Sequence, residues 1–142
     1  MTASPGLDFP GVGCGLVIQN AEGKVLLYRR VKAPEAGYWN IVGGKVDQME
    51  HSSEAARREA QEETGLSIGS VEFLCAVEAL VEADRQHWIS LIYLTREFSG
   101  EPQLAEPDKL SEMGWFDLSD LPQPLSVFSA KAFAALANSS LA

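Results

Sequence analysis

Apolar runs separated by turn-forming residues predict strands over the first third of the chain. Residues 12–18 are small and apolar, 19–23 form a turn, and 24–30 resume the apolar pattern, which predicts a hairpin of two paired strands. A further short apolar run covers 39–42, after a loop at 32–38. Gly43 and Gly44 follow it, and we expect them to break the strand.

A helical pattern replaces the strand pattern at residues 52–64, where Glu, Ala, Arg and Gln predominate. Ser52 or Ser53 is placed to cap its start, and Gly65 is placed to end it in a left-handed conformation. A second, amphipathic helix is predicted at 126–137.

Two longer strands are predicted at residues 71–82 and 87–98, with a turn at 83–86. Residues 99–109 hold two prolines and are typical of a loop, and Trp115 and Phe116 form a short strand. This order of strand, helix, strand pair and helix predicts one α/β domain over 1–142, with a mixed sheet covered on both faces.

Composition narrows the classes of function. The net charge of −9 argues against a nucleic-acid polymer or an anionic membrane as partner, although a bound cation would let an acidic protein hold phosphates. We find no signal-peptide pattern or apolar run long enough to span a bilayer, and we expect a cytoplasmic protein. Cys14 and Cys75 lie in apolar runs and are expected to be buried free thiols.

Three carboxylates share one face of the predicted helix at 52–64. Glu59, Glu62 and Glu63 are three and four positions apart, so they repel one another unless a cation lies among them. Hard ions such as Mg²⁺ prefer carboxylate oxygens and commonly bind substrate phosphates as well. Before the helix, Gly43 and Gly44 permit a backbone turn that can direct a carbonyl oxygen at such an ion.

Glu50 precedes the helix and is placed to reach Arg58, which would brace the loop as an orienting residue. The competing interpretation is a solvated acidic helix with interleaved arginines, the usual meaning of a charge run. That interpretation leaves the paired glycines, the offset of Glu50 and the position of Gly65 unexplained.

With these residues in view, the stretch 44–66 resembles the Nudix box: Gly44, Glu50, Arg58-Glu59, Glu62-Glu63 and Gly65 stand at every fixed position. Ala60 is small where a larger aliphatic residue is usual. The resemblance implies an α/β/α sandwich with a mixed β-sheet and a loop–helix–loop motif. It implies Mg²⁺, for which Mn²⁺ may substitute, held by Glu59, Glu62, Glu63 and the Gly43 carbonyl. In MutT-like relatives the position of Glu59 is proposed as the general base.

Outside the box, residues 106–109 resemble the Glu-Pro-Glu-Lys stretch of small Nudix enzymes that cleave nucleoside triphosphates. By this analogy Asp108 or Glu112 supplies a further carboxylate near the metal; the alternative is an ordinary polar loop acid. Trp39, Trp88 and Tyr93 are candidates to stack on a base, with core packing as the alternative. Arg29, Arg30 and Lys32 are candidates for phosphate contacts. We expect Trp39, Gly44, Arg29 and Trp88 to contact the substrate.

The resemblance implies a pyrophosphohydrolase that converts a nucleoside triphosphate to the monophosphate and pyrophosphate, including damaged nucleotides. One alternative is a nucleoside-diphosphate-sugar hydrolase acting on ADP-ribose, although the N-terminus lacks the extra strands that many such enzymes use to dimerise. A catalytically inactive nucleotide-binding module is the alternative of another class. We expect a small nucleotide as the substrate, no nucleic-acid or membrane partner, and a monomer or homodimer.

Overall fold

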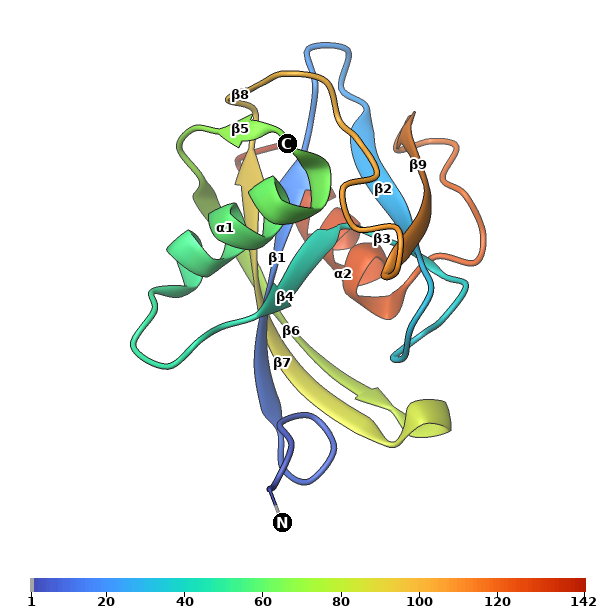
Figure 1. Ribbon diagram of the computed structural model, residues 1–142. Helices are drawn as coiled ribbons and strands as arrows, with labels where there is room; N and C mark the ends of the chain where they lie inside the picture. Colours follow the sequence, from blue (N-terminus) through green and yellow to red (C-terminus); the bar gives the residue numbers. More distant parts are fainter. Residues whose placement is uncertain (1) are drawn as a thin grey trace.

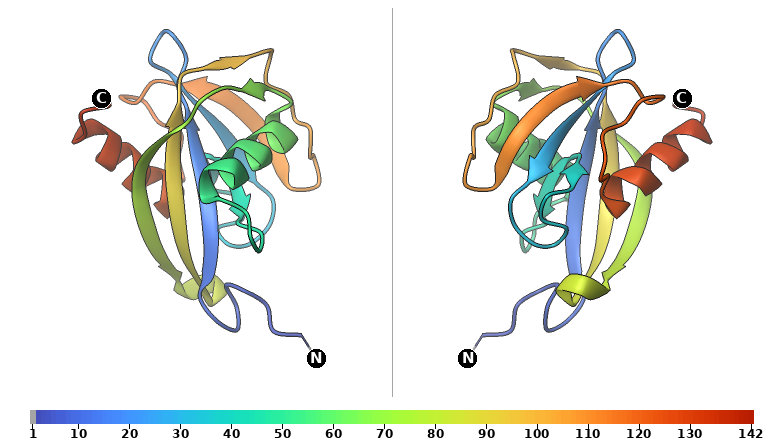
Figure 2. Two further views of the ribbon diagram at one scale, coloured as in Figure 1. Left: turned by 90° about the vertical axis from the view of Figure 1, so that its left-hand side faces the viewer. Right: turned by 90° about the vertical axis from the view of Figure 1, so that its right-hand side faces the viewer.

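The computed structural model describes residues 2–142 and places a helix on each face of a four-stranded sheet, with a three-stranded sheet beside it (Figures 1 and 2). The strands are β1 (Gly11–Ile18), β2 (Val25–Arg30), β3 (Trp39–Asn40), β4 (Val42–Lys45), β5 (Ser67–Ile68), β6 (Glu72–Val81), β7 (Gln86–Thr95), β8 (Phe98–Ser99) and β9 (Leu110–Phe116). The helices are α1 (Ser52–Thr64), the 3₁₀ turn η1 (Glu82–Asp84) and α2 (Val127–Ala137).

The larger sheet has the order β4-β1-β7-β6, in which β1 runs parallel to β7 and antiparallel to β4. The smaller sheet has the order β3-β2-β9, and β5 pairs with β8. The predicted mixed α/β architecture is therefore confirmed, as are the two long strands, which the structure places at β6 and β7.

The predicted hairpin of the first two strands is wrong. Both edges of β1 are occupied, by β4 and β7, so β2 cannot pair along it. After the turn the chain makes one isolated bridge, between Gln19 and Val25, and then crosses into the smaller sheet, where β2 pairs with β3 and β9.

The predicted strand at 39–42 is also corrected. Its residues are divided between β3 and β4, which belong to different sheets, with Ile41 between them. Gly43 and Gly44 do not break β4 but lie inside it, opposite Gly15 and Cys14. A Cβ on Gly43 would lie 2.1 Å from the Cys14 carbonyl oxygen, so the pairing of β4 with β1 requires glycine there.

Helix α1 matches its predicted bounds, but the expected serine cap is wrong. The residue at the N-cap position is His51, which makes no side-chain capping hydrogen bond. At the other end Gly65 has the predicted left-handed conformation, with φ 76°, and its N–H donates to the Gln61 carbonyl. Helix α2 begins one residue later than predicted because Ser126 is its N-cap and accepts from the Ser129 N–H.

Each helix closes its own hydrophobic core. Ala55, Ala56 and Ala60 of α1 pack against β1 residues such as Leu16, while Phe133 of α2 packs in a second cluster on the other side. Cys14 is buried as predicted, but Cys75 is only half-buried. Neither helix in residues 2–142 has the length and apolar character needed to cross a membrane.

Candidate active site

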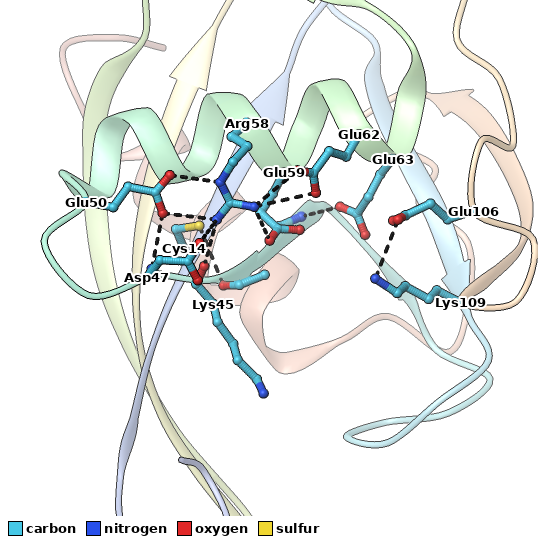
Figure 3. A network of polar contacts seen from close by, with 12 residues as sticks. Cys14, Lys45, Asp47, Glu50, Arg58, Glu59, Glu62, Glu63, Glu106 and Lys109 are labelled. Atoms are coloured by element: carbon cyan, nitrogen blue, oxygen red, sulfur yellow. Dashed lines mark hydrogen bonds and ion pairs between the residues drawn. The ribbon is translucent and has the colours of Figure 1, made fainter. Parts of the chain in front are cut away.

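The acidic face of α1 lies against the two glycines of β4 (Figure 3). Glu63 is 7% exposed, and its Oε1 accepts a 2.8 Å hydrogen bond from the Gly43 N–H. Burial raises the pKa of this carboxyl to about 8, because the charged form loses its hydration. A carboxylate buried in this way is stabilised by a nearby cation.

Glu59 lies directly over Gly44. A Cβ on Gly44 would approach the Glu59 carboxylate to 2.4 Å, so the missing side chain makes the space that the carboxylate occupies. Burial raises the pKa of Glu59, and the bonds from Arg58 oppose that shift. Two glutamates of α1 therefore meet β4 at adjacent residues: Glu63 accepts from the Gly43 N–H, and Glu59 occupies the space beside Gly44.

Arg58 joins the acidic residues into one network (Figure 3). Its guanidinium donates to both carboxylate oxygens of Glu50, at 2.8 and 3.0 Å, which is the contact expected from the sequence. The Nη1 group also donates to Glu59 at 2.9 Å and lies 3.3 Å from Glu62. These bonds lower the pKa of Glu50 and hold the loop before α1 against the helix.

The loop before β9 brings a further acid to the cluster, and it is Glu106. The charge of Glu106 acts on Glu63, and Lys109 lies 3.5 Å from the Glu106 carboxylate. The structure places neither of the two acids chosen from the sequence there. Asp108 is exposed, and Glu112 forms a 3.0 Å ion pair with Arg29 on the strand pair β2–β9.

The donor chemistry fits a divalent cation. Glu59, Glu62, Glu63 and Glu106 offer hard carboxylate oxygens, and the Oε1 atom of Glu106 is buried without a hydrogen-bond partner. In residues 2–142 no group of three acidic, histidine or cysteine side chains is already arranged to hold a metal ion, and Arg58 pairs with Glu59 and Glu62.

A cavity of about 370 Å³ adjoins the acidic cluster, on the other side of β4. Its size is within the range of small-molecule sites. The lining includes Gly43, Gly44 and Lys45 of β4, and Trp88, one of the substrate contacts predicted from the sequence. Arg30 lines the cavity, whereas Arg29 pairs with Glu112; the pairing of β2 with β9 changes register between these two residues.

Asn40 lines the same cavity and was not identified from the sequence. The hydroxyls of Ser126 and Ser129 lie 2.5 and 2.7 Å from its Oδ1, and Ser129 also accepts from the buried Ile41 N–H. Both serine hydroxyls thus occupy Oδ1. The Nδ2 group has no hydrogen-bond partner within residues 2–142, so it is the donor that Asn40 offers the cavity. Only the packing of α2 on β3 reveals this role.

Three other residues considered from the sequence, Trp39, Tyr93 and Cys14, pack or form hydrogen bonds within the protein. Trp39 packs edge-on against Phe116, at 5.2 Å between ring centroids, and is not among the cavity-lining residues. The Tyr93 hydroxyl lies 2.6 Å from Ser52 at the start of α1. Cys14 lies beside Gly44, but burial raises its pKa to about 12, which is unsuitable for a thiolate nucleophile.

Comparison with known proteins identifies relatives of this chain. A family model of the NUDIX domain matches residues 9–136. The chain is 33% identical over 107 residues to an oxidized purine nucleoside triphosphate hydrolase of Danio rerio, which covers 75% of this chain and 67% of that protein. It is 36% identical over 115 residues to an ADP-ribose pyrophosphatase of Methanocaldococcus jannaschii. That match covers 80% of this chain and 66% of the pyrophosphatase. An RNA pyrophosphohydrolase of Erythrobacter litoralis is 24% identical, with 86% and 85% covered.

The fold has a solved counterpart of comparable length. The crystal structure of a MutT NUDIX hydrolase from Burkholderia pseudomallei superposes with a TM-score of 0.85 at 43% identity. The match covers 89% of this chain and 98% of that one.

Proposed function

The chain belongs to the Nudix hydrolase family, and we propose that it converts nucleoside triphosphates to nucleoside monophosphates and pyrophosphate. Hydrolysis of pyrophosphate bonds in nucleotides is the activity that its relatives share. One observation carries the choice of substrate. The cavity and the acidic cluster both border Gly43 and Gly44, which supports a substrate with its nucleoside in the cavity and its phosphates at the carboxylates.

Nudix hydrolases generally use divalent metal ions, and we propose Mg²⁺, with Mn²⁺ able to substitute. Glu59, Glu62 and Glu63 would hold the ion with the Gly43 carbonyl, and Glu106 takes the place of Asp108 and Glu112 as the added carboxylate. When bound, the ion polarises the phosphoanhydride and lowers the pKa of a coordinated water.

The chain itself supplies orientation and proton transfer. Glu59 is proposed as the general base that takes a proton from the attacking water, and burial raises its pKa toward the range useful for that role. Arg58 and Glu50 hold the loop and keep the Glu59 carboxylate directed across Gly44. Arg30, Trp88 and Asn40 are proposed to contact the nucleotide in the cavity.

The relatives suggest two competing substrates, ADP-ribose and RNA. A net charge of −9 disfavours an RNA polymer, because phosphate contacts along a strand require lysine and arginine. We propose that the substrate is a small nucleotide. We also propose that the protein is cytoplasmic and is a monomer or a homodimer.

Hydrolysis in ¹⁸O-labelled water tests this function. With Mg²⁺ and a panel of nucleoside triphosphates, oxidised purine triphosphates among them, we expect monophosphate and pyrophosphate as primary products. Primary release of orthophosphate would exclude the proposed cleavage. If ADP-ribose or 5′-triphosphorylated RNA is hydrolysed faster than the nucleoside triphosphates, the proposed substrate is wrong. No hydrolysis of any compound would favour a nucleotide-binding module without catalytic activity.

A further inference from the structure

The segment 31–37, between β2 and β3, forms part of the cavity wall. Ala33 and Pro34 line the cavity together with residues of β1, β4 and β7. Arg30, which also lines the cavity, binds this segment through its guanidinium. The Nε group donates to the Pro34 carbonyl at 2.7 Å, and the Nη2 group donates to the Ala33 carbonyl at 3.4 Å. The segment is therefore attached to a side chain that itself lines the cavity.

A second attachment comes from the opposite sheet. The Oδ2 atom of Asp84 accepts a 2.9 Å hydrogen bond from the Glu35 N–H. Asp84 belongs to η1, at the tip of the hairpin formed by β6 and β7, which extends beyond the body of the molecule in Figure 1. The bond thus joins the hairpin of the larger sheet to a loop of the smaller one.

A third attachment reaches α2. Both carboxylate oxygens of Glu35 lie 3.2 Å from the N–H of Val127, the first residue of α2. Glu35 has φ 57°, a left-handed conformation that side-chain-bearing residues seldom adopt, so its contacts hold the backbone in a shape that it disfavours. A strained conformation persists only where the surrounding contacts hold it, so each of these contacts contributes to the position of the segment.

We propose that Asp84 is a positioning residue for the substrate, because its bond to Glu35 latches the segment 31–37 across the cavity and limits the size of the bound nucleotide. This role rests on the proposed function in so far as the cavity binds a nucleotide. Within residues 2–142 the Asp84 side chain makes its only hydrogen bond to the Glu35 N–H, and its charge also acts on Arg30 and on the Glu35 carboxylate, which hold the same segment.

Amide hydrogen exchange of residues 31–38, without nucleotide or metal, tests the latch by itself. In Asp84→Ala the exchange should become about tenfold faster, because a hydrogen bond to a charged acceptor is lost. Asp84→Asn keeps an acceptor oxygen and should restore most of the protection. Glu82→Ala removes a carboxylate from the same turn that makes no hydrogen bond within the described residues, and should resemble wild type. Unchanged exchange in Asp84→Ala would overturn the latch.

Kinetics on the same variants test the effect on substrates. We expect Asp84→Ala to raise KM for a nucleoside triphosphate about 3–10-fold with kcat changed less than about 2-fold, a loss the size of one hydrogen bond. The ratio of kcat/KM for ADP-ribose to that for the triphosphate should rise, and Asp84→Asn should reverse both changes. Faster exchange with unaltered KM and ratio would show that the segment does not limit the cavity.

Failure of the proposed function is visible in the wild-type protein alone. If the wild-type protein prefers ADP-ribose, the proposed substrate is wrong. The change in the ratio of the two kcat/KM values between wild type and Asp84→Ala still tests the latch. If the ratio does not move in that case, the latch has no part in substrate selection.

Discussion

Arg58 is the residue on which the acidic groups of α1 and its preceding loop converge. Its planar guanidinium contacts Glu50 through two nitrogens and Glu59 and Glu62 through the third, which an ammonium group cannot reproduce. The network therefore depends on the shape of the side chain as well as its charge.

We expect Arg58→Lys to reduce kcat/KM about tenfold, because the charge remains but the bidentate bond to Glu50 is lost. Glu50→Gln should act similarly, and the double variant should lose less than the product of the two separate effects. Kinetics of the four proteins measure this coupling, with Arg57→Lys as the control, since Arg57 has no ion pair within residues 2–142. Independent, multiplicative losses would mean that Arg58 and Glu50 act separately.

Replacing Glu62 or Glu63 by glutamine keeps the shape of the side chain and removes its charge. We expect kcat to fall at least about 100-fold, because these carboxylates are proposed to hold the metal. Glu54→Gln, an exposed change in the first turn of the same helix, is the matched control and should keep wild-type kcat. Wild-type rates in both variants would remove Glu62 and Glu63 from the site.

The buried charge of Glu63 predicts how the metal-free protein responds to pH. Its pKa is raised to about 8 in the folded state, so the folded state keeps a proton that the unfolded state loses near pH 4.5. The contribution of Glu63 to stability is thus complete below pH 4.5 and is lost as the pH rises toward 8. In EDTA, Glu63→Gln should have a higher Tm than wild type at pH 8, and the difference should shrink toward pH 5. A constant difference would contradict the raised pKa.

At the scale of elements, the site is a contact between one strand and one helix. Strand β4 approaches β1 closely at Gly43 and approaches α1 closely at Gly44. The two glycines are adjacent, yet a Cβ added to each would meet a different kind of neighbour: backbone in one case, the end of a flexible side chain in the other.

Alanine at these two positions should separate stability from activity. In Gly43→Ala the Cβ would lie 2.1 Å from the Cys14 carbonyl oxygen, so β4 and β1 must move apart, at a cost of about 3 kcal/mol or more. In Gly44→Ala the Glu59 carboxylate can shift away, so Tm should stay near wild type while kcat falls about tenfold or more. Thermal unfolding and kinetics of both variants decide this, and a wild-type Tm for Gly43→Ala would contradict it.

In the molecule as a whole, α2 connects the second core to the cavity lined by Asn40 and Ile41. Ser129 accepts from the buried Ile41 N–H, between β3 and β4, and its hydroxyl also lies 2.7 Å from Asn40. A helix near the end of the chain thereby fixes the junction at which the chain passes from one sheet to the other.

Ser129→Ala should cost about 1–3 kcal/mol, because the Ile41 N–H loses its acceptor in a buried position. It should also raise KM, since Asn40 loses one of the two hydroxyls that orient its amide. Denaturant unfolding and steady-state kinetics measure the two effects, with Ser53→Ala on α1 as the control. Loss of stability with unaltered KM would show that Asn40 does not contact the nucleotide.

Features that depend on neighbours a few residues apart could be predicted from the sequence alone. Helix α1 and its end at Gly65 follow from local propensity and glycine geometry, and the shared face of Glu59, Glu62 and Glu63 follows from helical periodicity. The contact of Arg58 with Glu50 lies within the same short stretch and was predicted with it.

The tertiary structure decided which distant elements meet. The parallel pairing of β1 with β7, and the division of 39–42 between two sheets, depend on strand contacts between residues far apart in the chain. The same holds for the proposed site residues Arg30 and Glu106, because the fold brings Arg30 to the cavity and the charge of Glu106 close to Glu63. Local periodicity gives the alternation of side chains along a strand, but the face that meets the cavity is selected by packing between elements distant in sequence.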